Sequence, residues 1–355
     1  MLISKTVQMK QSTLLLIICT LCLLSCQQEK ITIGTNVSET VYLDNNGASM
    51  RMLIEGNTSS RTFLLFIHGG PGTSAFFYNT DYLSQHLENR YALVYWDHRN
   101  SGASQGNTNQ KYLNLPQMTE DLKKVIQVIR HRYGNHSRVF IVGHSFGGLL
   151  ASSFMTTKDY QKMVNGWIVA GGSHNYPLNN ILTRDMLQEI GEKEYQKKRH
   201  TSKWKEIIDY CQHLPDHMTL EQANQLNTYA TDAENLIDGI TNFDVMTFIK
   251  KYGIKDKWPI TSIFLNHSYS QGASFNHDLA KTEFSSQLPK ITTPTLLIFG
   301  KYDFICPPGL GQDIYHLVNT MSKKLVISEV SGHSVMFQDE SLFCEEVSAF
   351  IDTYQ

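Results

Sequence analysis

Apolar and polar positions alternate along the chain in two rhythms, one typical of strands and one typical of helices. Short, continuous apolar runs suit strands that are buried on both faces of a parallel sheet. They occur at 62–67, 91–96, 139–142, 166–170 and 295–299. Helical spacing follows several of them, as at 118–133, where Leu122, Val125 and Ile129 share one face. This alternation predicts an α/β fold with a mostly parallel central sheet and helices on both faces.

Weaker patterns complete the predicted order of elements. Strands at 37–43 and 48–55 flank Asp44-Asn45-Asn46-Gly47, a turn signal typical of a hairpin. Further helices are expected at 76–88, 146–157, 309–319 and 340–353, with a strand at 324–329. Between 173 and 288 the chain is polar and helical without a strong apolar strand. We therefore expect a core at 37–172, a helical cap at 173–288, and a second core segment at 289–355.

The first 25 residues have the pattern of an export signal. Lys5 and Lys10 precede an apolar run at 14–24, which is shorter than the roughly 20 residues that span a bilayer. The run ends in Leu23-Leu24-Ser25-Cys26, which resembles a bacterial lipobox. The resemblance implies a lipoprotein signal peptide at 1–25, diacylation of Cys26, and a tether at 26–36. It places the protein in a bacterial cell envelope, anchored to a membrane and facing the periplasm or the surface. A plain secretory signal with an incidental Cys26 is the alternative.

Composition narrows the function classes. The chain has 355 residues, 41% hydrophobic and 18% charged, and a formal net charge of −2. This is an ordinary globular composition, and nothing in it favours a nucleic-acid partner. No Cys-x-x-Cys pair lies beyond the leader, so a structural zinc site is not expected. Three cysteines remain after the leader: Cys211, Cys306 and Cys344. The sequence does not decide whether Cys306 and Cys344 form a disulfide.

The segment Gly143-His144-Ser145-Phe146-Gly147 joins the predicted strand at 139–142 to a predicted helix. A serine on such a tight strand-to-helix turn has an exposed hydroxyl and faces the first N–H groups of the helix. This is the position that a nucleophile of acyl transfer requires. We interpret His144 as a packing residue.

A serine nucleophile needs a base, and the base needs a carboxylate that orients it. His333 directly follows the strand at 324–329, and Asp303 follows the strand at 295–299. The order Ser145, Asp303, His333 is the order of nucleophile, acid and base in one common hydrolytic fold. Asp97 and Asp339 are rival acids, but Asp97 precedes the serine and Asp339 has the position of a helix start.

An oxyanion intermediate needs two N–H donors. The residue after the nucleophile, Phe146, supplies one. The other is expected from His68-Gly69-Gly70-Pro71-Gly72, a glycine-rich loop that follows the strand at 62–67. Glycines allow the backbone of such a loop to approach a substrate closely.

Together these motifs resemble the α/β-hydrolase superfamily, and more narrowly its prolyl aminopeptidase (proline iminopeptidase) branch. The resemblance rests on the 68–72 loop, on 97–104, on Gly300-Lys301-Tyr302-Asp303 with Cys306-Pro307-Pro308, and on Gly332-His333-Ser334. It implies that Ser145 is the nucleophile, Asp303 and His333 complete a triad, and Gly70 and Phe146 donate to the oxyanion. No metal or cofactor is implied.

The chain departs from that branch at three places. His144 and Phe146 stand where the aminopeptidases typically have Gly and Trp, Asn100 replaces a Gly, and the cap lacks a Trp-x-x-Trp-Glu element. The branch binds the substrate's α-amine with acidic cap residues. The cap contains several acids outside any matching motif: Glu189, Glu192, Glu194 and Glu234.

The sequence therefore predicts a serine hydrolase that works through an acyl-enzyme. Its first expected activity is that of an aminopeptidase-like peptidase that releases N-terminal residues from short peptides. A carboxylesterase acting on small esters is the alternative, and a non-catalytic surface binding protein is a third. A serine nucleophile, rather than an aspartate, argues against dehalogenase or epoxide-hydrolase chemistry.

Overall fold

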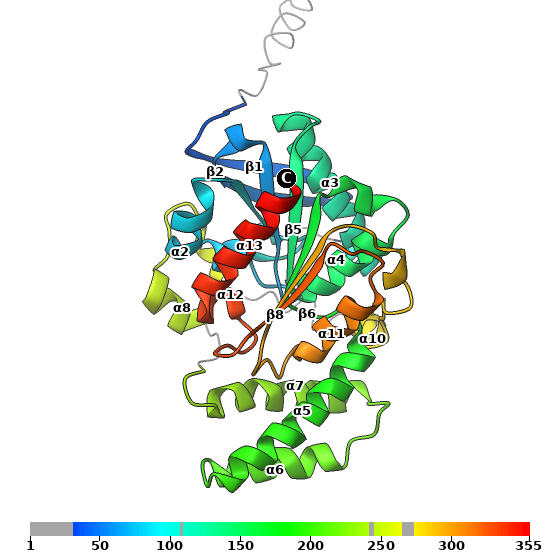
Figure 1. The fold of residues 1–355 in the computed structure, drawn as a ribbon. Helices are drawn as coiled ribbons and strands as arrows, with labels where there is room; N and C mark the ends of the chain where they lie inside the picture. Colours follow the sequence, from blue (N-terminus) through cyan, green and yellow to red (C-terminus); the bar gives the residue numbers. More distant parts are fainter. Residues whose placement is uncertain (1–30, 107–108, 241–244, 265–272) are drawn as a thin grey trace, which may run out of the picture. The chain divides into compact units, whose positions relative to one another are not determined.

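An eight-stranded sheet crosses the part of the chain that the computed structural model describes, in the order β1-β2-β4-β3-β5-β6-β7-β8 (Figure 1). The described residues are 31–106, 109–240, 245–264 and 273–355. The strands are β1 Val37–Asn45, β2 Ala48–Gly56, β3 Thr62–Ile67, β4 Ala92–Trp96, β5 Arg138–Ser145, β6 Gly166–Gly172, β7 Thr295–Gly300 and β8 Lys323–Ser328. Strands β3 to β8 pair in parallel, whereas β2 pairs antiparallel with both β1 and β4. The expected mostly parallel sheet is confirmed.

The predicted leader, Cys26 and residues 27–30 of the tether lie outside the described residues. Residues 33–355 form one compact unit, which contains every strand of the sheet. Within the described ranges, no helix combines the length and the apolar character needed to cross a membrane.

The first hairpin follows from its turn residues. Asn45 pairs with Ala48, so only Asn46 and Gly47 connect β1 to β2. Both have positive φ, at 45° and 75°. Asn and Gly tolerate this conformation, and a two-residue turn of this kind matches the twist of the strands.

Helices cover both faces of the sheet, as expected. One face packs against α3 (Leu115–Tyr133), α4 (Phe146–Thr156) and α11 (Pro308–Leu317). The other packs against α2 (Asp81–Leu83), α12 (Val335–Gln338) and α13 (Glu340–Tyr354) (Figure 1). Strand β3 serves both cores, because its alternate residues point to opposite faces. This explains its unbroken apolar run.

Helices are inserted between β6 and β7, and the first three of them lie beyond one end of the sheet (Figure 1). They are α5 (Tyr176–Gln196), α6 (Thr201–Gln212), α7 (Leu220–Leu236), α8 (Val245–Tyr252) and α10 (Ala273–Leu279). Helices α5 to α7 have their own apolar cluster, which includes Trp204 and Leu226, and Phe304 from the loop after β7 is part of it. The cap is thus packed directly onto the loop that carries Asp303.

The prediction of one continuous helix over 76–88 is wrong. The segment forms a 3-10 turn (Ala75–Tyr78), the short α2, and a wider turn (Ser84–Glu88). Asn79 interrupts the helix because its side chain donates to Glu55 Oε2 at 2.6 Å and accepts from Trp258 Nε1 at 3.4 Å. Thr80 then starts a new turn by accepting from the N–H of Leu83. Tertiary contacts therefore override the local helical pattern here.

Candidate active site

Ser145 is the last residue of β5, and α4 begins at Phe146. Its backbone has φ 56° and ψ −125°, a conformation that non-glycine residues rarely adopt and that costs about 1–3 kcal/mol. The side chain is half-buried, whereas its neighbours His144 and Phe146 are buried. The turn therefore presents the hydroxyl of Ser145 at the edge of the sheet.

The two glycines of this turn are required by close packing. A Cβ at Gly143 would lie 2.6 Å from the carbonyl oxygen of Gly147. A Cβ at Gly147 would overlap the carbonyl oxygen of Ile67 and lie 2.7 Å from its carbonyl carbon. Backbone atoms cannot rotate away as side chains do. The Gly-x-Ser-x-Gly pattern thus has a steric cause in the contact between α4 and the end of β3.

Substitution of Gly147 by alanine is expected to lower the free energy of unfolding by about 3 kcal/mol, because α4 must move away from β3. Urea unfolding of the purified variant measures this. Gly34→Ala is the matched control, since a Cβ there meets only a Val37 methyl group at 3.7 Å. Equal urea midpoints for the Gly147 variant and the wild type would show that the packing is looser than described.

Asp303 and His333 form the pair that the sequence predicted. His333 Nδ1 lies 3.1 Å from Asp303 Oδ1 and 3.0 Å from Oδ2. Asp303 is fully buried, and its Oδ1 also accepts from the backbone N–H groups of Ile305 and Cys306. A carboxylate in this place holds the proton of His333 on Nδ1 and leaves Nε2 as the base.

Ser145, His333 and Gly70 line one cavity of about 420 Å³. Their positions come from the ends of three parallel strands, β5, β8 and β3, which meet at one edge of the sheet. Among the described residues, no hydrogen bond joins Ser145 Oγ to His333. Such bonds are often long without a substrate and tighten when one binds.

Ser145 and Gly70 also line a larger cavity of about 600 Å³, to which Phe146 contributes. Gly69 packs against Ser145, because a Cβ on Gly69 would lie 2.9 Å from Ser145 Cβ. Gly70 has φ 111°, which favours glycine, and Thr73 Oγ1 fixes the loop by donating to the carbonyl of Gly69 at 2.6 Å. Phe146 is the first residue of α4, where backbone N–H groups lack intrahelical partners. The two predicted oxyanion donors therefore flank Ser145.

Burial sets the electrostatics of this centre. It lowers the pKa of His333 to about 4, which favours the neutral imidazole. Burial also raises the pKa of Asp303, although the N–H groups of Cys306 and Ile305 oppose the rise. A neutral His333 is the form that accepts a proton from a serine.

A cap carboxyl also reaches this centre, and no motif had singled it out. Glu234, at the end of α7, is fully buried, and its Oε1 accepts from the backbone N–H of His333 at 2.8 Å. Within the described part of the chain, its Oε2 has no hydrogen-bond partner. Burial first, and then the nearby Asp303, raise the pKa of Glu234 well above its usual range. We therefore assign the proton of this carboxyl pair to Glu234, since Asp303 has more donors around it.

The three cap acids that the sequence analysis named together with Glu234 have other surroundings. Glu189 pairs with Lys193 at 2.6 Å, Glu194 pairs with Lys197 at 2.6 Å, and Glu192 is exposed. Only the tertiary fold distinguishes Glu234 from these three.

His144 does more than pack. Its ring nitrogens contact Tyr78 Oη and the carbonyl oxygen of His333 at 2.7 and 3.1 Å. His144 is buried among aromatic rings, as the packing interpretation expects, but that interpretation missed its two polar contacts. The signal in the sequence was a polar, titratable side chain next to the nucleophile.

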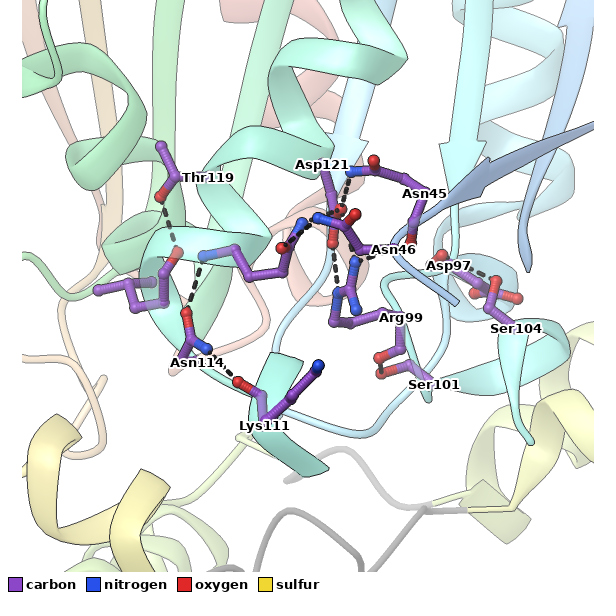
Figure 2. Close-up of polar contacts among 12 residues, drawn as sticks. Asn45, Asn46, Asp97, Arg99, Ser101, Ser104, Lys111, Asn114, Thr119 and Asp121 are labelled. Atoms are coloured by element: carbon purple, nitrogen blue, oxygen red, sulfur yellow. Dashed lines mark hydrogen bonds and ion pairs between the residues drawn. The ribbon is translucent and has the colours of Figure 1, made fainter. Parts of the chain in front are cut away.

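The rival acids have structural roles. Asp97 is buried at the end of β4, where Oδ1 accepts from Ser74 Oγ and the N–H of Ala75, and Oδ2 accepts from the N–H of Ala103. Asp97 and Ser104 hold the turn that follows β4, beside a buried ion pair in which Arg99 Nη2 donates to Asp121 Oδ1 at 2.8 Å (Figure 2). Asp339 accepts from Ser328 Oγ at 2.7 Å and precedes α13. Neither acid contacts His333 among the described bonds.

The cysteines that the sequence left open are free thiols. Cys211, Cys306 and Cys344 are all buried and unpaired within the described part of the chain. Burial, together with Asp303 and Glu234, raises the pKa of Cys306 well above its usual range, so this thiol stays protonated beside the site. The candidate disulfide is not formed in this structure.

Comparison with known proteins agrees with this fold. The sequence pattern of a family described as "alpha/beta hydrolase fold" matches residues 62–340. A proline iminopeptidase of Saccharolobus solfataricus is 27% identical over 311 residues, which cover 81% of this chain and 84% of the relative. A probable aminopeptidase of Bacillus subtilis is 24% identical over 84% of this chain and 91% of its own length.

Solved structures share the fold at lower sequence identity. A proline iminopeptidase-related protein from Thermus thermophilus superposes with a TM-score of 0.62 at 14% identity. The match covers 90% of this chain and 98% of that one. At this identity the likeness concerns the fold alone.

Proposed function

The chain belongs to the alpha/beta hydrolase fold family, and on that premise we propose that it is a serine hydrolase working through an acyl-enzyme. Ser145 Oγ attacks a carbonyl carbon while His333 Nε2 takes the hydroxyl proton. The N–H groups of Gly70 and Phe146 stabilise the resulting oxyanion. Asp303 keeps the imidazole oriented and stabilises its cationic form.

The reaction is completed by returning the proton. When the carbon–leaving-group bond breaks, His333 gives its proton to the departing oxygen or nitrogen, and the acyl group stays on Ser145. Water then attacks this ester, His333 takes one of its protons, and the free acid leaves as Ser145 regains its hydrogen. The groups that form bonds or transfer protons in these steps, Ser145 and His333, line the same cavity.

One observation carries this proposal. Ser145 is held in a strained backbone conformation at the edge of a cavity that it shares with His333, and His333 is bonded to the buried Asp303. Strain of this kind persists only where the surrounding structure imposes it, and it clusters at functional sites.

The two cavities suggest how a substrate lies. His333 lines only the smaller cavity, so the leaving group belongs there, next to its proton donor. That cavity has an apolar wall formed by Phe77, Val245 and Phe337. The acyl group then occupies the larger cavity, which is rich in amide side chains: Asn179, Asn180, Asn224, Asn227 and Asn276.

The first candidate activity that we propose is that of an aminopeptidase-like enzyme acting on short peptides without a metal or cofactor. The names of the two relatives support it, as does the 68–72 loop.

Esterase activity on small neutral esters is the second candidate, and the charge of the cavities favours it. Among the described residues that line either cavity, there is no Asp or Glu. An α-ammonium group enclosed there would lack a counter-charge, which is costly. Neutral acyl groups avoid this cost and find hydrogen-bond partners in the asparagines.

A matched panel of substrates separates these candidates. It contains the p-nitroanilides of Pro and Ala, their N-acetyl forms, and p-nitrophenyl acetate and butyrate, each assayed with Ser145→Ala as background. Turnover of the free-amine anilides but not of their N-acetyl forms supports the aminopeptidase. Turnover of the esters alone rejects it in favour of the esterase. No Ser145-dependent turnover at all would favour the surface binding protein.

The pH dependence of kcat/KM follows from the burial of His333. The imidazole must be neutral to accept the serine proton, and burial lowers its pKa to about 4 from an ordinary 6.5. Activity should therefore persist as pH falls through 6 and be lost only as it approaches about 4. Initial rates from pH 3.5 to 8, with tryptophan fluorescence to confirm folding, measure this. An acidic limb centred at 6.5 or higher would contradict it.

We also propose that the protein is anchored through Cys26 in a bacterial cell envelope. The lipobox-like 23–26 segment and the polar residues after it support this. Expression of the full chain and of Cys26→Ser in a bacterium, followed by fractionation, tests it. The wild type should partition with membranes and the variant should not. Equal partitioning of both would reject the anchor.

A further inference from the structure

We propose that Tyr78 and His144 are positioning residues that connect the oxyanion loop to the base His333 through one chain of hydrogen bonds. The inference rests on the proposed serine hydrolase function and adds two residues to its machinery. It concerns how the site is held in register, since neither side chain takes part in bond making.

Three consecutive contacts make up this chain. The backbone N–H of Gly69, next to the oxyanion donor Gly70, donates to Tyr78 Oη at 3.2 Å. Tyr78 Oη lies 2.7 Å from His144 Nδ1. His144 Nε2 lies 3.1 Å from the carbonyl oxygen of His333. These contacts thus link the loop after β3 to the loop after β8 through the residue that precedes Ser145.

The groups at the two ends of the chain determine the donor and the acceptor in each of its hydrogen bonds. The carbonyl of His333 can only accept, so His144 Nε2 carries a hydrogen and donates. A neutral imidazole has one N–H, so Nδ1 must accept, and the Tyr78 hydroxyl must be its donor. The Tyr78 oxygen is then free to accept from the N–H of Gly69. Only one tautomer of His144 satisfies all three contacts.

The surroundings keep His144 neutral. Both Tyr78 and His144 are buried, and the ring of His144 lies 4.7 Å from that of His333, centroid to centroid. The other titratable groups facing it are Tyr78 and His68. Burial and the neighbouring His333 both lower the pKa of His144, so protonation of Nδ1 does not compete with the Tyr78 bond.

The two ends of this hydrogen-bond chain, the loop with Gly70 and the base His333, both act on the same transition state. Gly70 must direct its N–H at the oxyanion while His333 stays within reach of Ser145. A displacement of about 1 Å between such groups can cost about 100-fold in rate. The Tyr78–His144 pair holds both loops to the turn that carries the nucleophile.

Four variants test the proposal with the ester or anilide that the wild type hydrolyses fastest. His144→Phe removes both polar contacts, and Tyr78→Phe removes the hydroxyl. We expect kcat to fall about 10- to 100-fold in each, with KM changed less than about threefold. His144→Gln can still donate to His333 and accept from Tyr78, so it should recover most of kcat. Tyr82→Phe, on a tyrosine stacked against His86, is the control that should leave kcat unchanged.

A spectroscopic readout is independent of catalysis. NMR of uniformly ¹⁵N-labelled protein should show His144 with a protonated Nε2 and a bare Nδ1, and Tyr78→Phe should shift its signals. Urea midpoints of all variants separate positioning from a loss of folding.

These measurements test the positioning role separately from the proposed hydrolase function. Equal kcat in His144→Phe, His144→Gln and wild type would overturn the positioning role, as would a protonated Nδ1 in His144. If the wild type hydrolyses nothing, the proposed function fails, whereas the tautomer of His144 still reports on the hydrogen-bond chain by itself.

Discussion

Replacing Ser145 by alanine is expected to lower kcat/KM by about 10⁵- to 10⁶-fold on any substrate that the wild type hydrolyses. Without the hydroxyl there is no acyl-enzyme, and the remaining oxyanion donors and binding contacts contribute only a residual rate. Because alanine is smaller than serine and the residue is half-buried, the fold should tolerate the change. Steady-state kinetics on enzyme purified in parallel with wild type measures the effect.

The same position offers a control on stability. Serine and alanine are both strained at a φ of 56°, whereas glycine is not. Ser145→Gly should therefore raise the free energy of unfolding by about 1 kcal/mol while abolishing activity. Activity within tenfold of wild type in either variant would exclude Ser145 as the nucleophile.

Asp303→Asn is expected to produce the second-largest loss, about 10⁴-fold in kcat. The amide oxygen can keep the bonds from the N–H groups of Ile305 and Cys306. The amide cannot hold His333 in the tautomer with a proton on Nδ1, nor stabilise the imidazolium. Geometry is preserved while the base loses its orientation and its counter-charge. Pre-steady-state measurement of acylation isolates this effect from product release.

Asp339→Asn is the matched control for that experiment. Asp339 was a rival acid in the sequence, lies six positions after His333, and bonds to Ser328 Oγ. Its substitution should change kcat less than about threefold, since it has no contact with the imidazole. A larger loss from Asp339→Asn than from Asp303→Asn would reverse the assignment of the acid.

Much of the core could be predicted because its signals are local. The apolar runs of β3, β4 and β7 are continuous since both faces of these strands are buried. Asn46 and Gly47 predict the first turn through backbone conformations that few other residues adopt. The parallel strands then bring their carboxyl ends to one edge, which is why residues far apart in the chain, Asp303 and His333, could be paired from their positions after strands.

What the sequence did not show depends on long-range contacts. The helix over 76–88 is broken because Asn79 bonds to Glu55 and Trp258, neither of which is near it in the chain. Glu234 looks like any other polar residue of a cap helix until the fold buries it against His333. His144 acquires its partners, Tyr78 and the His333 carbonyl, only when three loops meet. A one-dimensional pattern does not contain these distances.

The central claim is that Ser145 is a nucleophile activated by His333. Treatment of the wild type with a fluorophosphonate, followed by intact mass measurement and peptide mapping, tests it most directly. We expect one adduct per chain, located on Ser145, which forms much more slowly in His333→Ala and is absent from Ser145→Ala. An unmodified wild type, or an adduct on a residue other than Ser145, would contradict it.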